Sequence, residues 1–303
     1  MVNAVSLRTS HWWPYFIFAI GTLAGSAGPI VLRYAHAQGV PSPVLTAFRL
    51  TISALLFTPL VFNRYGDELR RLSRKDVLVG ILAGAIFAIH FMLVFDSYRF
   101  TTILIAGVLI GAIPLWTALI ERFVLHERLG RAVWGGLAIS LAGGAVISLS
   151  GSTSTHPGEN LLVGGALALS AAVLGAVYLI VGRSLRRHVS FVPFTWLICS
   201  SAAVVALITL AAGHIPITGY STEGYFWILM AAIFPQLIAH GAFNYVLAYL
   251  SPTLVSMNGQ LTNVLGAAAA FFLFAELPGP MQLIGSAIII VGVMFVIFGQ
   301  TKE

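Results

Sequence analysis

Long apolar runs separated by short polar segments cover the chain from residue 14 to residue 299. Each run has about 20 residues, the length at which an α-helix crosses the hydrocarbon core of a bilayer. Because lipid offers backbone N–H and C=O groups no hydrogen-bond partner, such runs must satisfy these groups internally, as helices. The pattern predicts an all-α polytopic membrane protein with ten transmembrane helices, at residues 14–34, 42–62, 77–97, 101–121, 131–150, 160–181, 192–213, 223–247, 252–274 and 279–299.

The composition supports the same class of protein. Of the 303 residues, 58% are hydrophobic and only 9% are charged, whereas soluble domains carry about 25% charged residues. No small-residue cleavage site follows a short apolar stretch at the N-terminus, so we expect residues 14–34 to stay as the first span rather than to be removed as a signal peptide. The single cysteine, Cys199, excludes an intrachain disulfide.

A segment of the chain occurs twice. Pro114–Gly143 and Asn263–Gly292 align when the sequence is shifted by 149 residues, with Gly136 on Gly285 and Gly143 on Gly292. In both copies a long apolar run ends at a lone glutamate and is followed by a second apolar run. The repeat predicts two similar halves, residues 1–150 and 151–303, with five spans each.

The basic residues orient these spans. If the N-terminus is cytoplasmic and the spans alternate, 13 of the 16 Lys and Arg residues lie on the cytoplasmic side. The positive-inside rule therefore predicts a multi-pass protein of the cell inner membrane with both termini in the cytoplasm. The same distribution accounts for the formal net charge of +6 without a nucleic-acid partner.

Five spans in each half require the second half to enter the membrane from the opposite side. The repeated glutamates then lie on opposite faces, Glu127 at the cytoplasmic face and Glu276 at the external face. Inverted repeats of this type enclose a substrate site near the bilayer midplane and give alternating access when they rock. We therefore expect residues 14–150 to move against residues 160–299 around a central cavity.

The segments at residues 43–57, 113–147 and 261–297 share an order and spacing with a known family. The chain resembles the drug/metabolite transporter superfamily, specifically bacterial proteins with two EamA domains, over nearly its whole length. It departs from the pattern at Asn263, where the first copy has Pro114. The resemblance implies a secondary carrier, often an exporter. It does not imply a substrate, because the superfamily moves amino acids, nucleotide sugars, sugar phosphates and drugs.

Two histidines within the apolar runs are candidate substrate ligands. His90 and His240 lie 150 residues apart, close to the repeat of 149, so symmetry-related helices would bring both to one cavity. Imidazole both donates and accepts hydrogen bonds and titrates near neutral pH. The alternative is that each ring bonds to a neighbouring helix. Neither histidine has the spacing or carboxylate partner of a metal site.

Other polar and aromatic residues in the spans are further candidates. Asn244 follows His240 by four residues, so both lie on one helix face, and Asn263 adds an amide in the next span. Trp116 and Tyr178 are aromatic residues that could wall a cavity. The alternative for the amides is hydrogen bonding between helices, and for the aromatic rings it is packing.

The charged residues have several interpretations. Arg49 lies one or two turns from the external surface and could bind a carboxylate or phosphate, but the resemblance favours a gating or structural role. We expect the same structural or gating role for Glu127 and Glu276, each of which precedes a helix. Asp96 and Glu121 lie near span ends and are expected to be interfacial.

These observations favour a secondary transporter of a small metabolite such as an amino acid. The alternatives are an intramembrane enzyme, a channel, or a permease for nucleotide sugars, sugar phosphates or drugs. The sequence has no GxSG or HExxH motif and no pair of aspartates in mid-span, which disfavours an enzyme. It has no phosphate-binding GxxxxGK[ST] loop, so we expect no cofactor and no ATP site. The expected partners are the substrate and the lipid bilayer, and a homodimer remains open.

Overall fold

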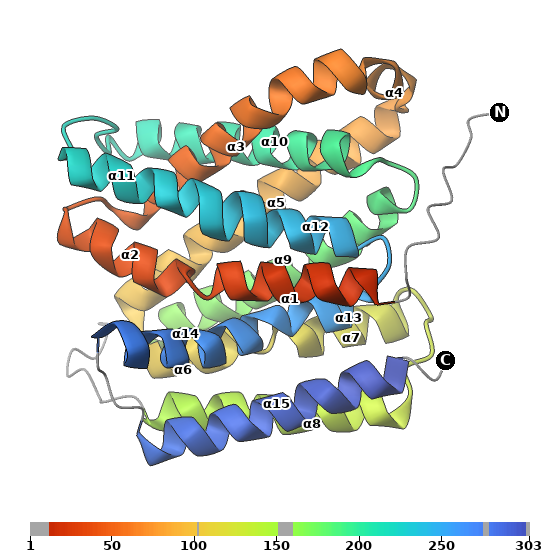
Figure 1. Ribbon diagram of the computed structural model, residues 1–303, viewed down its shortest axis with the longest axis vertical. Coiled ribbons are helices and arrows are strands. Elements are labelled where there is room, and N and C mark those ends of the chain that lie inside the picture. Colours follow the sequence, from red (N-terminus) through yellow and green to blue (C-terminus); the bar gives the residue numbers. More distant parts are fainter. Residues whose placement is uncertain (1–11, 102, 151–159, 275–278, 301–303) are drawn as a thin grey trace.

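The computed structural model describes residues 12–101, 103–150, 160–274 and 279–300, and the regular structure in these ranges is helical throughout. The helices lie side by side in one bundle (Figure 1). The first half contains α1 (Trp13–Gly25), α2 (Gly28–Ala37), α3 (Ser42–Arg64), α4 (Gly66–Arg71), α5 (Arg74–Phe100), α6 (Ile103–Ile110), α7 (Ile113–Phe123) and α8 (Arg131–Ser150). The second half contains α9 (Leu161–Arg186), α10 (Phe191–Ala212), α11 (Thr222–Ala231), the π-helix η1 (Ala232–His240), α12 (Gly241–Val246), α13 (Pro252–Ser256), α14 (Asn258–Phe274) and α15 (Pro280–Gln300).

The predicted spans are present. Eight helices, some of them made of consecutive pieces, are long and apolar enough to cross a membrane, and Arg131–Ile147 is a shorter apolar helix. Together with α13 and α14 they give the ten spans. The described start of α1 and end of α15 lie at the same end of the bundle as α4 (Figure 1). An even number of crossings requires this arrangement.

Local sequence signals set where the helices begin. The Ser73 hydroxyl accepts a hydrogen bond from the backbone N–H of Asp76 at 3.1 Å, and the Ser221 hydroxyl accepts one from Gly224 at 3.0 Å. These N-caps satisfy N–H groups that have no partner within the helix. Gly39 turns the chain between α2 and α3 with a φ of 73°, a conformation that favours glycine.

Several spans are interrupted at prolines. The first span breaks between Gly25 and Gly28, with Pro29 in the first turn of α2. The fourth breaks before Pro114. In the eighth span Pro235 lies inside the π-helix η1. Because proline has no N–H, it removes a hydrogen bond and leaves a carbonyl free within the helix. Such irregular turns occur frequently at functional sites.

The helices α8 and α15 pack through glycines related by the repeat. A Cβ added to Gly136 would lie 2.5 Å from the carbonyl oxygen of Gly292, and one added to Gly143 would lie 2.7 Å from that of Gly285. The sequence aligns Gly136 with Gly285 and Gly143 with Gly292, so each contact is the symmetry mate of the other. The two helices therefore run antiparallel across a pseudo-twofold axis, as an inverted repeat requires.

The two halves interlock instead of forming separate lobes. The most extensive helix contacts join α8 to α15, α5 to α9, and α3 to α10, and each pair takes one helix from each half. A motion that separated residues 14–150 from residues 160–299 as blocks would break all of this packing. The two halves of the linear repeat therefore share extensive packing.

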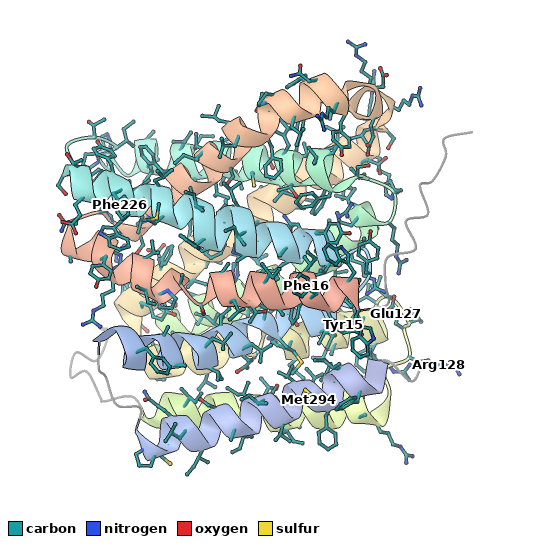
Figure 2. All side chains as sticks on the ribbon, viewed as in Figure 1. Tyr15, Phe16, Glu127, Arg128, Phe226 and Met294 are labelled. Carbon is teal, nitrogen blue, oxygen red and sulfur yellow. The ribbon has the colours of Figure 1, made fainter. Side chains whose placement is uncertain are left out.

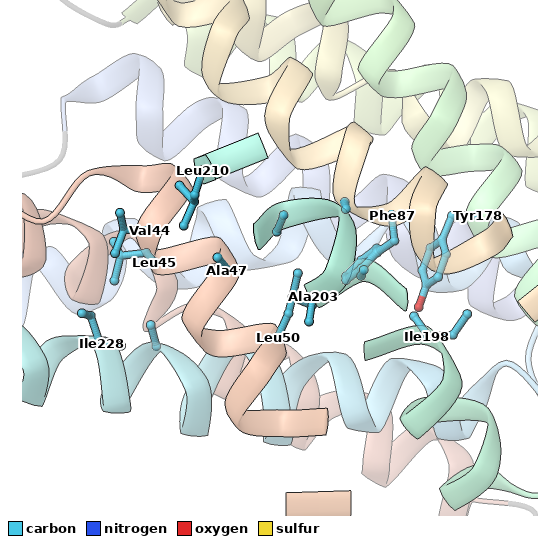
Figure 3. Packing of buried hydrophobic residues seen from close by; sticks show 14 of the residues in the cluster. Val44, Leu45, Ala47, Leu50, Phe87, Tyr178, Ile198, Ala203, Leu210 and Ile228 are labelled. Carbon is cyan, nitrogen blue, oxygen red and sulfur yellow. The ribbon is translucent and has the colours of Figure 1, made fainter. Parts of the chain in front are cut away.

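The outer surface and the interior differ as a membrane protein requires. Phe16, Phe226 and Met294 point outward from the sides of the bundle, whereas Glu127 and Arg128 lie at one end (Figure 2). In the interior, apolar side chains such as Leu50 and Ile198 pack between the helices (Figure 3). The apolar exterior matches the hydrocarbon of the bilayer, so the polar residues within the spans must face protein or a cavity.

The glycine packing predicts an effect on stability. Gly136→Ala should lower the free energy of unfolding by about 1–3 kcal/mol, because the added methyl group would overlap the α15 backbone. Thermal unfolding of the purified protein in detergent measures the effect. Gly135→Ala is the matched control, since no atom lies within 4 Å of a Cβ at Gly135. Equal melting temperatures for the two variants would contradict the close approach.

Candidate functional site

A cation and an aromatic ring meet in the middle of the bundle. The guanidinium carbon of Arg49, on α3, lies 4.1 Å from the centre of the Phe91 ring, on α5. The His240 ring, at the end of η1, packs edge-on against Phe91 with ring centres 5.8 Å apart, and against Phe87 at 5.1 Å. Arg49 and His240 are close enough to interact electrostatically. We call Arg49, Phe87, Phe91 and His240 the central cluster.

The central cluster lies on the pseudo-twofold axis. Phe91 and His240 are 149 residues apart and so occupy equivalent positions in the two halves. Gly111 and Gln260 are also 149 apart, and the Gln260 side-chain N–H donates to the Gly111 carbonyl at 2.9 Å. A residue contacts its own counterpart only near a twofold axis. The cluster therefore occupies the position where inverted repeats build their substrate sites.

His90 is held by a neighbouring helix. Its Nδ1 donates to the Ala171 carbonyl on α9 at 2.7 Å, and its ring lies against Gly175, where a Cβ would be 3.1 Å away. Because a carbonyl only accepts, Nδ1 must carry the proton. The structure thus gives His90 the interhelical bond that was the alternative to substrate contact. His240 has no hydrogen-bonding partner of this kind in the described part of the chain.

Tyr178 and Asn244 bond to each other. The Tyr178 hydroxyl, on α9, donates to Oδ1 of Asn244, on α12, at 2.6 Å, and both side chains are buried. The Tyr178 ring also packs on Phe87, with centres 4.5 Å apart (Figure 3). The pair borders the central cluster and fixes the position of Phe87. One face of the cluster is therefore rigid.

The lone cysteine lies beside the central cluster. Cys199, on α10, is 1% exposed, and its Sγ accepts a weak hydrogen bond from the Gln236 side chain on η1 at 3.7 Å. Cys199 is also close enough to Arg49 to interact electrostatically. The thiol can therefore report whether the centre of the bundle is open to solvent.

A cavity lies at the end of the bundle where α3 begins. It has a volume of about 230 Å³ and is lined by residues from α3, α5, α10 and the loop after α10, with Asp96 at its rim. Thr46 in its wall precedes Arg49 by three residues, so both lie on one face of α3. Met92 in its wall directly follows Phe91. The cavity thus ends about one helical turn from the central cluster.

A buried carboxylate lies at the opposite end of the bundle. Glu121, on α7, is fully buried, which corrects the expectation of an interfacial charge. Its Oε2 accepts hydrogen bonds from the backbone N–H of Thr253 at 3.1 Å and from the Thr253 hydroxyl, at the start of α13. Its Oε1 is buried with no hydrogen-bond partner in the described residues. This contact joins the two halves.

The remaining predicted residues lie elsewhere. Trp116 is half-buried on α7 and makes no ring contact with the central cluster. Glu127 lies in the loop after α7 and forms a 3.4 Å ion pair with Arg187, at the same end of the bundle as Glu121. Glu276 and the side chain of Asn263 lie outside the described part of the structure.

Sequence reasoning missed the neighbours that define the site. Phe87 and Phe91 read as ordinary apolar residues of a span, and only the 149-residue shift that pairs Phe91 with His240 gives a signal for one of them. Thr253, the partner of Glu121, is 132 residues away and no motif connects them. In the described residues no group of three His, Cys, Asp or Glu side chains could hold a metal ion.

Comparison with known proteins agrees with this architecture. The S-adenosylmethionine uptake transporter of Rickettsia felis is 25% identical over 94% of this chain and 92% of its own length. The "Uncharacterized transporter YdfC" of Bacillus subtilis is 23% identical over 85% of this chain and 82% of its own length. The "Probable terminal-alkyne amino-acid exporter" of Streptantibioticus cattleyicolor is 26% identical over 63% of each chain.

The fold is also known from a solved structure. A crystal structure with 20% sequence identity superposes with a TM-score of 0.80 over 96% of this chain and 98% of its own. The model of the EamA-like transporter family matches this chain twice, at residues 12–149 and 162–298. Because these two matches take in most of the sequence and coincide with the two halves of the bundle, the protein belongs to the EamA-like transporter family.

Proposed function

We propose that this protein is a secondary transporter that exports a small metabolite of the amino-acid class across the cell inner membrane by alternating access. The observation that carries the proposal is the central cluster. Arg49 and His240 are polar side chains held in the middle of an apolar bundle, on the axis between two inverted repeats. Because polar groups at this depth are costly, they commonly mark substrate or ion pathways. We propose that His240, Tyr178 and Asn244 line the substrate path, and that Trp116 and Asn263 contribute to it elsewhere along its length.

The similar proteins support the substrate class. Two of them are named for S-adenosylmethionine and for terminal-alkyne amino acids, and both compounds contain an amino-acid group. One of these names states uptake and the other export, so direction rests on the tendency of the superfamily toward export. The central cluster contains one arginine, Arg49, and one histidine, His240, and His90 is nearby. This is too little positive charge for a substrate with several phosphates.

The energy for transport comes from a gradient in this proposal, because the sequence has no ATP-binding loop. The positive-inside distribution places both termini in the cytoplasm. The Glu121–Thr253 contact then lies near the cytoplasmic face, and the cavity beside Thr46 opens toward the outside.

Contacts between the halves at each end would act as gates. The residues of the repeats, 1–150 and 151–303, meet at the cytoplasmic end through Glu121 and Thr253. At the external end the Gln38 side chain donates to Glu223 at 2.9 Å, and Tyr34 stacks on Trp227 with ring centres 4.4 Å apart. In alternating access one set opens while the other stays closed. Helices from both halves would move together, since the halves interlock.

One prediction of the transport proposal concerns the flux of substrate. His240→Ala should lower the transport rate of the protein in proteoliposomes about tenfold, because the substrate loses a polar contact of about 1.5 kcal/mol. The measurement is counterflow of radiolabelled amino acids and their derivatives. His36→Ala is the control, since His36 is exposed at the external end.

An unchanged flux through the His240→Ala protein would remove His240 from the substrate path. An absence of saturable flux for every compound of the panel in the unmodified protein would contradict the transport proposal itself. Circular dichroism and gel filtration of each variant show whether it is folded.

Another prediction of the transport proposal concerns the gate at the Glu121–Thr253 contact. Glu121→Gln should raise the rate at which a membrane-impermeant maleimide labels Cys199 from the cytoplasmic side about fivefold. The reason is that a neutral amide accepts weaker hydrogen bonds from Thr253 than a carboxylate does. Inside-out vesicles give access from that side, and Cys199 is the only cysteine of the chain.

Asp67→Asn is the matched control at the same end of the bundle. Asp67 is an exposed residue of α4, so replacing its carboxylate by an amide should leave the labelling rate at the original value. Equal labelling rates for Glu121→Gln and the unmodified protein would contradict a gate at Glu121.

A further inference from the structure

The guanidinium of Arg49 is the least satisfied polar group of the central cluster. Its Nε and Nη2 atoms are buried and have no hydrogen-bond partner in the described residues. The face of the group lies on the Phe91 ring, which attracts a cation but accepts none of its in-plane N–H groups. Arginine stays charged in proteins and has five donors. Two of its donors are therefore left without an acceptor in this conformation.

No carboxylate of the described chain compensates this charge. The nearest candidate along α5, Asp96, pairs instead with Arg99 at 3.3 Å near the surface. Glu121 bonds to Thr253. The groups that face Arg49 electrostatically are Cys199, from α10, and the histidines of α5 and η1. A thiol and a neutral imidazole carry no negative charge, and a protonated imidazole is a cation. None of these groups therefore offsets the positive charge of Arg49.

A buried unpaired charge is a costly feature, since removing it from water is repaid only by an opposite charge in good geometry. A purely structural arginine would donate to helix carbonyls, as Arg186 does to the carbonyl of Asn244 at 2.9 Å. Arg183 does the same to the carbonyl of Leu250, also at 2.9 Å. Arg49 differs from both, and this difference indicates a missing anionic partner.

The surroundings limit what that partner can be. The cavity that ends one turn from Arg49 has a volume of about 230 Å³, below the roughly 300–1,000 Å³ of sites for drug-sized ligands. Its walls include Met92 and Phe95. A small molecule with one anionic group and an apolar body fits this combination. The shape of the arginine edge favours an anion with two coplanar oxygens.

We propose that Arg49 binds the carboxylate of the transported molecule through two parallel hydrogen bonds, with the apolar part of the molecule against Phe91 and Phe95. This inference rests on the proposed transport function and adds the group that is recognised. Asp96, the described carboxylate that lines the cavity, is paired with Arg99 at 3.3 Å, so it is not left free for an ammonium group. The carboxylate is therefore required for binding and the amino group is dispensable.

The experiment uses the unmodified protein in detergent and measures its thermal stabilisation by matched ligands, because a ligand that binds the native state raises the melting temperature. The probes are L-leucine, L-phenylalanine and L-methionine, each with its 2-oxo acid, its carboxamide and its decarboxylated amine. We expect stabilisation by the amino acids and the 2-oxo acids. The carboxamides and the amines should bind at least about tenfold more weakly.

Substitutions of the arginine add a second arm. Arg49→Gln should abolish the preference for carboxylates over carboxamides, and Arg49→Lys should reduce the affinity for carboxylates about tenfold, because lysine lacks the bidentate fork. Arg33→Gln, an exposed arginine in the outer part of the bundle, is the matched control and should leave the preference intact. If Arg49→Gln does not fold, the ligand series on the unmodified protein still decides the question.

Each outcome has one meaning. Equal stabilisation by carboxylates and carboxamides, or no stabilisation by any carboxylate of the panel, would overturn the assignment. A retained carboxylate preference in folded Arg49→Gln would do the same. Transport of a compound without a carboxylate in proteoliposomes would refute the role of Arg49 while leaving the transporter proposal standing. Binding of carboxylates without any flux would have the opposite consequence.

Discussion

Hydrocarbon offers polar groups no hydrogen-bond partner, and the rest of this structure depends on that constraint. It forces the backbone into helices and turns Phe16, Phe226 and Met294 toward lipid. It also drives the polar side chains of the spans inward, where Tyr178 pairs with Asn244. Buried polar atoms that have no hydrogen-bond partner are therefore the exceptions that need an explanation. Arg49 and one oxygen of Glu121 are two such groups.

The pseudo-twofold axis determines where the halves meet. Glycines at equivalent positions let α8 and α15 approach until a single methyl group would clash. On the same axis, equivalent positions contact each other directly, as Gly111 and Gln260 do. Where both copies carry the same residue, symmetry builds a scaffold. Where they differ, as at Phe91 and His240, the same symmetry brings two different side chains into contact and produces an asymmetric site.

Periodic signals in the sequence could predict only part of the arrangement around the central cluster. The repeat brought His240 to the axis, but it also made His90 look equivalent, although a shift of one residue along a helix turns a side chain by about 100°. That rotation directs His90 to the Ala171 carbonyl on α9. Glu121 looked interfacial because its neighbour is Arg122, and only the fold brings Thr253 over it.

The sequence by itself determined the class of protein, the ten spans, the inverted repeat and the glycines of α8 and α15, because each of these follows from hydrophobic length, charge or spacing along one chain. The tertiary structure alone decided which polar residues meet. It packed helices of the two halves extensively against each other. It also left Arg49 over Phe91 without an acceptor. Contacts between helices far apart in the chain depend on packing in three dimensions, which leaves no local pattern in the sequence.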